Sequence, residues 1–205
     1  MPTILLIRHG NNDFMQKGLA GRLPGVHLNE SGRQQAYSLA GKLAGAPIKA
    51  IYSSPMERAL ETARPLAEVK GLAVLERPGF IEMDYGDWQG KTFKQLKRLK
   101  LWKLLMKDPA QVRFPGGESI CEAQERARLE LENIAAEYGD KDLLAFFTHS
   151  DIIRLLAAHY LEMPLRAYHK LSAYPASITI LFLNKENQVH LSTINHVEGF
   201  KFTKD

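Results

Sequence analysis

The chain contains 205 residues, of which 45% are hydrophobic and 24% are charged, and its formal net charge is +4. These ordinary globular values exclude a disordered or fibrous protein, and the length suits one sizeable domain. Because no apolar run approaches the ~20 residues of a membrane span and no secretory signal pattern is present, we expect a cytoplasmic protein that binds no membrane.

The first predicted element is an apolar strand that ends in polar groups. Residues 3–7 include four consecutive aliphatic side chains, which is typical of a strand buried on both faces in a parallel sheet. Arg8, His9 and Gly10 follow at its carboxyl end, where open α/β sheets place their ligands. A surface turn is the simpler interpretation of so short a motif, so the rest of the chain must decide.

The next segment predicts a loop, a helix and a second strand. Residues 11–27 are polar and glycine-rich, and a connection of that length tends to be functional. Asn29 can cap the helix that follows, and residues 48–53 predict the second strand.

A second helix follows this strand directly. Ser54 and Pro55 predict its start, with the serine as the cap and the proline at the first helical position. Arg58 then falls in the first turn, and Gly71 ends the helix. Residues 73–76 predict a third strand.

The segment after the third strand differs in composition. Residues 79–90 predict a loop rich in glycines, acids and aromatics, and residues 91–107 combine basic and apolar side chains as on one amphipathic helix. Its basic residues are Lys91, Lys94, Lys97, Arg98, Lys100, Lys103 and Lys107, beside Phe93, Leu96, Leu99, Trp102, Leu105 and Met106. A solvated helical face is favoured over a partner-binding surface. We expect residues 80–117 to form a loop and a small helical cap insertion.

The rest of the chain repeats the alternation of helix and strand. Residues 118–138 are the longest helical pattern, and residues 143–149 form a second apolar run that ends in a histidine. A helix over residues 152–161 and a hairpin over residues 177–194 follow. The order of elements predicts an α/β fold, a three-layer sandwich with helices on both faces of a mainly parallel central sheet.

Histidines, arginines and one helix start are expected at the same edge of this sheet. His9 and His149 end two buried strands, Arg8 precedes the first histidine, and Arg58 lies at a helix start. Guanidinium groups and the free N–H groups of a helix start both favour a phosphoryl group. A neutral imidazole among these cations can attack phosphorus and form a phosphohistidine.

Metal or cofactor chemistry is the main competitor to this interpretation. No pair among the seven histidines has a helical ligand spacing, and no cysteine ligand set or paired-aspartate motif is present. Nucleotide-binding glycine loops and nucleic-acid-binding motifs are absent as well. We therefore expect no metal, no organic cofactor and no nucleic-acid partner, and we expect the single Cys121 to be a small buried residue without a chemical role.

Five separated blocks of the chain form one recognisable series. They are Arg8-His9-Gly10, residues 53–63, Phe80-Ile81-Glu82 with Gly86, Trp88 and Gly90, residues 115–119, and Thr148-His149-Ser150. In order and approximate spacing they resemble the histidine phosphatase superfamily, in the branch that includes cofactor-dependent phosphoglycerate mutase. The resemblance covers about residues 3–195 and implies one phosphoglycerate mutase-like domain over residues 1–205. It also implies that His9 is the nucleophile, that Arg8 and Arg58 bind phosphate, and that His149 donates a hydrogen bond to the phosphoryl oxygens. Glu82 would protonate the leaving oxygen and later activate water.

The chain also departs from the pattern of this superfamily. Met15 stands where relatives have an asparagine ligand, and it lacks such a donor. Either Asn12 or a backbone amide replaces that ligand, or the pocket has one ligand fewer, and Asn12 is the phosphate contact that we expect. Ser150 stands in place of a glycine and is the second expected phosphate contact. Asp151 is a rival to Glu82 for the acid role.

Two further regions could contact the rest of the substrate. Arg22 and His27 lie in the loop where relatives make that contact, although a solvated loop is an equally good interpretation for each. If the insertion caps the site, Lys94, Lys97 or Arg98 would meet a second acidic group on the substrate.

The expected function is therefore a metal-independent phosphomonoester hydrolase that acts on a small phosphorylated metabolite. A phosphoglycerate mutase-type phosphotransferase uses the same residues, but such mutases are typically longer in the cap region. A non-catalytic phosphate-binding regulatory protein is the third interpretation. The sequence leaves open the substrate and whether the protein forms a homodimer.

Overall fold

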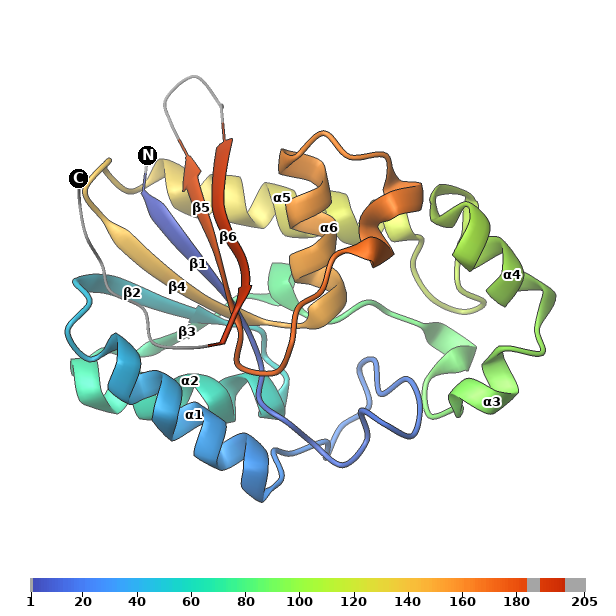
Figure 1. The fold of residues 1–205 in the computed structure, drawn as a ribbon, viewed down its shortest axis with the longest axis horizontal. Helices are drawn as coiled ribbons and strands as arrows, with labels where there is room; N and C mark the ends of the chain where they lie inside the picture. The colour runs from blue at the N-terminus through green and yellow to red at the C-terminus, as the bar shows by residue number, and fades with distance from the viewer. Residues whose placement is uncertain (1, 184–188, 198–205) are drawn as a thin grey trace.

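A six-stranded sheet forms the centre of the protein in a computed structural model, which describes residues 2–183 and 189–197 (Figure 1). The strands are β1 (Thr3–Arg8), β2 (Ile48–Ser53), β3 (Val74–Glu76), β4 (Leu143–Thr148), β5 (Ile178–Leu183) and β6 (Val189–His196). Their order across the sheet is β3-β2-β4-β1-β5-β6. The first four strands run parallel, whereas β5 is antiparallel to both β1 and β6.

Helices cover both faces of this sheet. α1 (Glu30–Leu43) and α2 (Glu57–Lys70) lie on one face, and α5 (Ile120–Ala136) and α6 (Ser150–Tyr160) lie on the other (Figure 1). The predicted three-layer α/β fold with a mainly parallel sheet is confirmed. No helix in the described part of the chain is long and apolar enough to cross a membrane.

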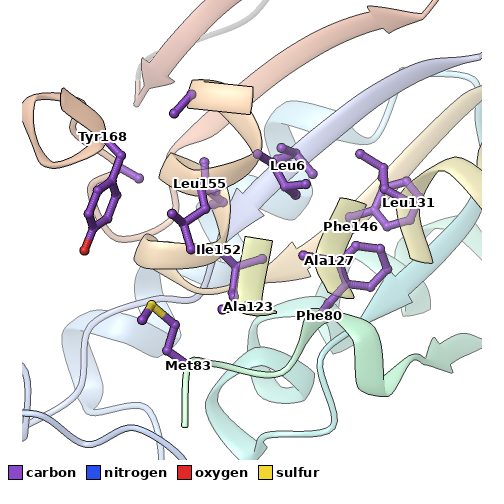
Figure 2. Close-up of a cluster of buried hydrophobic side chains, with 14 of the residues drawn as sticks. Leu6, Phe80, Met83, Ala123, Ala127, Leu131, Phe146, Ile152, Leu155 and Tyr168 are labelled. Atoms are coloured by element: carbon purple, nitrogen blue, oxygen red, sulfur yellow. The ribbon is translucent and has the colours of Figure 1, made fainter. Parts of the chain in front are cut away.

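The apolar run of β1 reaches both layers of the core because successive side chains of a strand point to opposite faces. Leu5 and Ile7 pack in the cluster beneath α1 and α2, whereas Ile4 and Leu6 pack in the cluster beneath α5 and α6. All four side chains are fully buried. Figure 2 shows Leu6 in the second cluster with residues from β4, α5 and α6.

Several local signals in the sequence are confirmed. The Asn29 side chain accepts a hydrogen bond from the Gly32 N–H at the start of α1, and Gly71 ends α2 with a left-handed backbone, φ 64°. Strands β5 and β6 pair as the predicted hairpin, although its connecting residues 184–188 lie outside the described residues.

The predicted start of α2 is wrong by two residues. Met56 is the N-cap and the helix begins at Glu57, so neither Ser54 nor Pro55 has the predicted helical role. The Ser54 N–H still bonds to the Phe147 carbonyl oxygen of β4, at 2.8 Å, which keeps this residue with the sheet.

The basic segment forms two short helices and not one. α3 (Phe93–Leu96) and α4 (Lys100–Lys107) are separated at Leu99, whose backbone is extended, ψ 141°. Leu96 and Leu105 are both buried, yet nine residues would place them on opposite sides of a continuous helix. The break allows both side chains to face the core.

Short 3-10 turns connect the remaining parts of the chain. They are η1 (Pro78–Phe80), η2 (Gly86–Trp88), η3 (Pro109–Gln111) and η4 (Leu165–Lys170). The prediction that Cys121 is buried is wrong, because it lies on the exposed side of the first turn of α5.

A close approach of two backbones holds the loop after β1 against α1. A Cβ atom on Gly32 would lie 2.1 Å from the Asn11 carbonyl oxygen, whereas a Cβ atom on Gly41 of the same helix would meet nothing within 4 Å. Only the first glycine is therefore required by packing.

We expect Gly32→Ala to destabilise the protein, although alanine is favoured over glycine in helices by about 1 kcal/mol. The matched variant Gly41→Ala should gain about 0.5–1 kcal/mol, because it keeps the helix benefit without the clash. Urea denaturation of both variants measures these changes. Equal stabilisation by the two substitutions would contradict the packing argument.

Candidate active site

Adjacent parallel strands bring the two predicted histidines together. β1 and β4 pair in register from Thr3 and Leu143 to Arg8 and Thr148, so the residue after each strand lies at the same edge. The rings of His9 and His149 have centroids 5.2 Å apart. Both histidines are buried, which is unusual for groups that can carry charge.

A cavity of about 440 Å³ opens at this edge of the sheet. The sequence-predicted residues that line it are Arg8, His9, Asn12, Arg58, Glu82 and Ser150. His149 is fully buried and is not part of the lining, and the rival acid Asp151 also lines the cavity. The structure therefore gathers these residues at one edge of the sheet, with His149 beside His9 behind the lining.

His9 is held as a neutral imidazole whose lone pair is at Nε2. Its Nδ1 lies 2.8 Å from the Gly10 carbonyl oxygen, which can only accept, so Nδ1 carries the proton. Burial and the charges of Arg58 and Arg8 lower the pKa of His9 well below its usual value. Arg58 Nε lies 3.3 Å from Nε2, a long contact that an entering anion can replace.

Three buried nitrogen atoms around His9 have no hydrogen-bond partner among the described residues. They are Arg8 Nε, Arg58 Nη1 and His149 Nδ1. Other atoms of the two guanidinium groups are fixed, since Arg8 Nη1 donates to the Ala173 carbonyl oxygen at 2.6 Å and Arg58 Nη2 donates to that of Gly21 at 2.8 Å. An unpartnered buried donor costs about 1–3 kcal/mol, so three together indicate a site built for an anion.

Ser54 orients the ring of His149. Its Oγ lies 2.7 Å from His149 Nε2 and accepts from the Met56 N–H at 3.3 Å. The Ser54 hydroxyl can donate its proton to His149 Nε2, and the imidazole proton is then on Nδ1. Burial and the charge of Arg58 lower the pKa of His149 well below its usual value, so the ring is a neutral donor.

Glu82 is a buried carboxyl group beside this ring. One oxygen, Oε2, lies 3.9 Å from His149 Nδ1, and the other accepts from the Met83 N–H at 3.0 Å. Burial and the charge of Asp151 raise the pKa of Glu82 to about 7, although Arg58 and Arg8 oppose the shift. Near neutral pH this group can both give and accept a proton.

Asp151 is engaged by other residues of the site. It accepts a hydrogen bond from the Tyr85 hydroxyl and forms an ion pair with Arg154. The Arg154 guanidinium lies over the ring of Tyr168, 5.4 Å from its centre. These contacts hold the Asp151 side chain in the cavity lining, where its charge acts on Glu82.

The loop after β1 fixes the residues that depart from the family pattern. Asn12 Oδ1 accepts from the N–H groups of Phe14 and Met15 at 3.0 and 3.1 Å, so its NH2 group is the end left to donate. The Met15 sulfur lies 3.7 Å from Arg8 Nη2. Ser150 is the first residue of α6 and lines the cavity.

Arg22 and His27 make contacts within the protein. Arg22 donates to the Glu82 carbonyl oxygen at 2.8 Å and pairs with Glu118 at 3.1 Å, so it holds the loop that carries Glu82. His27 is exposed and pairs with Glu61, which raises the pKa of the imidazole. Neither residue lines the cavity.

The expectation that basic residues of the insertion face the site is wrong. Lys94, Lys97 and Arg98 are exposed and do not line the cavity. The insertion instead contributes the apolar side chains Phe93, Trp102, Leu105 and Met106. The described residues include no group of three or more histidine, cysteine or acidic side chains that could hold a metal ion.

Sequence reasoning missed the contacts of Ser54, Tyr85 and Arg154. A signal existed for Ser54, because β2 pairs with β4 in parallel and the residues after both strands must meet. No pattern could place Tyr85 against Asp151, since these residues are 66 positions apart and come from a loop and a helix.

The α/β sandwich carries two histidines and two arginines at the carboxyl edge of its parallel strands, which is an arrangement suited to a phosphatase or a phosphoglycerate mutase-like enzyme. The sequence profile described as the histidine phosphatase superfamily (branch 1) matches residues 4–196. The chain belongs to this superfamily.

Similar proteins include enzymes with different names. The chain is 27% identical to phosphoserine phosphatase 1 of Hydrogenobacter thermophilus, over 93% of this chain and 91% of that protein. It is 31% identical to a 2,3-bisphosphoglycerate-dependent phosphoglycerate mutase of Thermoplasma acidophilum, over 88% and 87%. The solved structure of a mycobacterial glucosyl-3-phosphoglycerate phosphatase aligns with a TM-score of 0.86 and 27% identity, over 95% and 98%.

We expect Ser54→Ala to lower kcat about tenfold, because His149 Nε2 loses its partner and the Nδ1–H form is no longer fixed. Nitrogen NMR of histidine-labelled protein should show a changed tautomer for His149. Ser53→Ala is the matched control, since this neighbouring buried hydroxyl donates to the Ser54 carbonyl oxygen and not to the histidine. An unchanged His149 spectrum in Ser54→Ala would contradict the assignment.

Proposed function

We propose that the protein is a phosphomonoester hydrolase that acts on small phosphorylated metabolites through a phosphohistidine at His9. One observation carries the proposal: the unpartnered donors of Arg8, Arg58 and His149 surround a neutral imidazole with a lone pair at Nε2. Donors placed in advance around a phosphoryl group stabilise the charge of its oxygens in the transition state. The phosphatases among the similar proteins support the same conclusion.

In the first step, the His9 Nε2 lone pair forms a bond to phosphorus while the bond from phosphorus to the alcohol oxygen breaks. The Glu82 carboxyl group gives its proton to the leaving oxygen, so the alcohol departs neutral. Arg8, Arg58 and His149 donate to the phosphoryl oxygens throughout. Asn12 and Ser150 are the further donors that we assign to the phosphate.

In the second step, the Glu82 carboxylate accepts a proton from water as the water oxygen attacks phosphorus. The bond from phosphorus to His9 Nε2 breaks, and inorganic phosphate forms. Microscopic reversibility requires that the group that acts as the acid in one step acts as the base in the other. A pKa of about 7 suits both roles of Glu82.

A mutase is the second candidate because one similar protein is a phosphoglycerate mutase. The same residues would then return the phosphoryl group to a bound acid in place of water. Transfer between phosphoglycerates without release of phosphate would favour this candidate. Binding of phosphate esters without any turnover would favour a regulatory protein. Action in the cytoplasm and a single domain over residues 1–205 stay predictions of the sequence, and whether the protein forms a homodimer stays open.

We expect the purified protein to release phosphate from p-nitrophenyl phosphate in the presence of a chelator, and His9→Ala to abolish this release. The wild-type protein, stopped during turnover of a radiolabelled ester, should retain label that survives alkali, as a bond from nitrogen to phosphorus does. His27→Ala is the control, since this exposed histidine lies outside the cavity lining. Full activity of His9→Ala would overturn the mechanism.

We expect activity on an alkyl phosphate to fall as the pH rises through about 7, because the raised pKa of Glu82 keeps its active, protonated form below that pH. Glu82→Gln should lose about 10²–10⁴-fold on the alkyl ester and much less on a nitrophenyl ester, whose leaving group needs no proton. Profiles of kcat/KM against pH, recorded with both esters for the wild-type protein and Glu82→Gln, measure the pH at which activity falls and the loss on each ester.

Asp151→Asn distinguishes the two carboxyl groups. It should retain the acid step and move the fall in activity to lower pH, since the charge of Asp151 raises the pKa of Glu82. If Asp151→Asn shows the selective loss on the alkyl ester and Glu82→Gln does not, the assignment of the acid is wrong.

A further inference from the structure

The cavity has a second wall whose chemistry differs from that of the phosphate end. Besides the arginines and His9, the lining contains the apolar side chains Phe93, Trp102, Leu105 and Met106 of the insertion, together with Phe114 and Leu19. Met106 is 44% exposed, which is a large apolar surface left in contact with water at the cavity. Burial of such a surface by a ligand is favourable.

An aromatic stack holds this wall in place. Trp102 stacks on Trp88, with ring centres 6.1 Å apart, and Phe93 lies edge-on to Trp102 at 6.4 Å. Trp88 in turn contacts Phe114 at 5.2 Å, and Phe114 contacts Tyr85 at 5.0 Å. The wall is therefore connected to the loop that carries Glu82 and does not depend on one side chain alone.

The charged groups of the lining leave little to bind a second anion. Arg8 and Arg58 face His9, and Arg154 is paired with Asp151 and lies over Tyr168. Asp151 adds a carboxylate to the lining, and Glu82 is neutral in the form that gives its proton, so neither group attracts a carboxylate of the substrate. His169 Nδ1, a buried atom without a partner among the described residues, adds one polar contact.

We infer that the preferred substrates are phosphomonoesters of apolar alcohols, with an aromatic or bulky aliphatic group and no second anionic group. This inference rests on the proposed function and names the substrate class of the same site. The arginine end takes the phosphoryl group, and the insertion takes the alcohol part. Phosphorylated hydroxy acids and amino acids, whose alcohol parts carry a carboxylate, are poor substrates.

The test compares esters whose alcohols are similarly basic, so that the leaving group does not decide the result. Benzyl phosphate should exceed ethyl phosphate in kcat/KM by about tenfold or more, because its ring fills the apolar wall. It should also exceed 4-carboxybenzyl phosphate, phosphoserine and 3-phosphoglycerate. A reversal of either ordering overturns the inference.

Variants of the apolar lining residues test whether these residues cause the preference for benzyl phosphate over ethyl phosphate. Trp102→Ala and Met106→Ala should each lower the ratio of benzyl to ethyl phosphate, and Met106→Lys should raise the relative rate on 4-carboxybenzyl phosphate. Leu129→Ala is the matched control for Met106, because it is 45% exposed on α5 and lies outside the lining. Lys97→Ala tests the exposed basic face, and loss of activity on the carboxylated ester in this variant would overturn the inference.

The two proposals fail in different ways. If no ester is hydrolysed, the proposed function is wrong. If esters are hydrolysed but the ratio of benzyl to ethyl phosphate is near one and does not respond to Trp102 and Met106, only the substrate class is wrong. Circular dichroism of each variant confirms that the comparison concerns folded protein.

Discussion

Buried positive charge at the carboxyl edge of the sheet is the constraint on which the site depends. Arg58 is 2% exposed, and neither Arg8 nor Arg58 lies within 4.0 Å of a carboxylate in the described part of the chain. Such charge is costly to bury, and burial lowers the pKa of both guanidinium groups. The apolar strands and helices behind the edge must supply the stability that holds the arginines there.

The same charge sets the protonation states of its neighbours. Arg58 and Arg8 favour the neutral form of His9, which keeps the Nε2 lone pair available. They also lower the pKa of Glu82, but burial and Asp151 together act more strongly in the opposite direction. Two carboxyl groups in one cavity therefore differ in chemistry. Glu82 titrates near neutrality, whereas Asp151 is held by Tyr85 and Arg154.

The strand ends can be predicted from sequence because a buried parallel strand is a continuous apolar run and its end is marked by the first polar residue. This pattern places His9 and His149 each at the carboxyl end of a buried strand, and the parallel pairing of β1 with β4 brings the two to the same edge. The start of α2 is harder to predict, because Ser54 has the chemistry of a helix cap but bonds to β4 and His149. The prediction of one helix in the insertion is wrong because helical periodicity shows which residues are apolar, but not that the helix breaks at Leu99.

The two ends of the cavity, one that holds the phosphate and one that holds the alcohol, are built from different kinds of element. This difference explains how one superfamily can contain enzymes with different substrates. The phosphate end is built from sheet edges and helix starts, whose positions the fold fixes, so its residues can be predicted from sequence. The alcohol end is built from short helices whose orientation depends on tertiary contacts such as the stack of Trp88 on Trp102. Substrate names therefore transfer poorly between relatives that share about 30% identity, even when the phosphoryl chemistry is the same. In this chain the lysines of α3 and α4 are exposed, whereas Phe93 and Trp102 line the cavity, and on this arrangement we base the proposed preference for apolar alcohols.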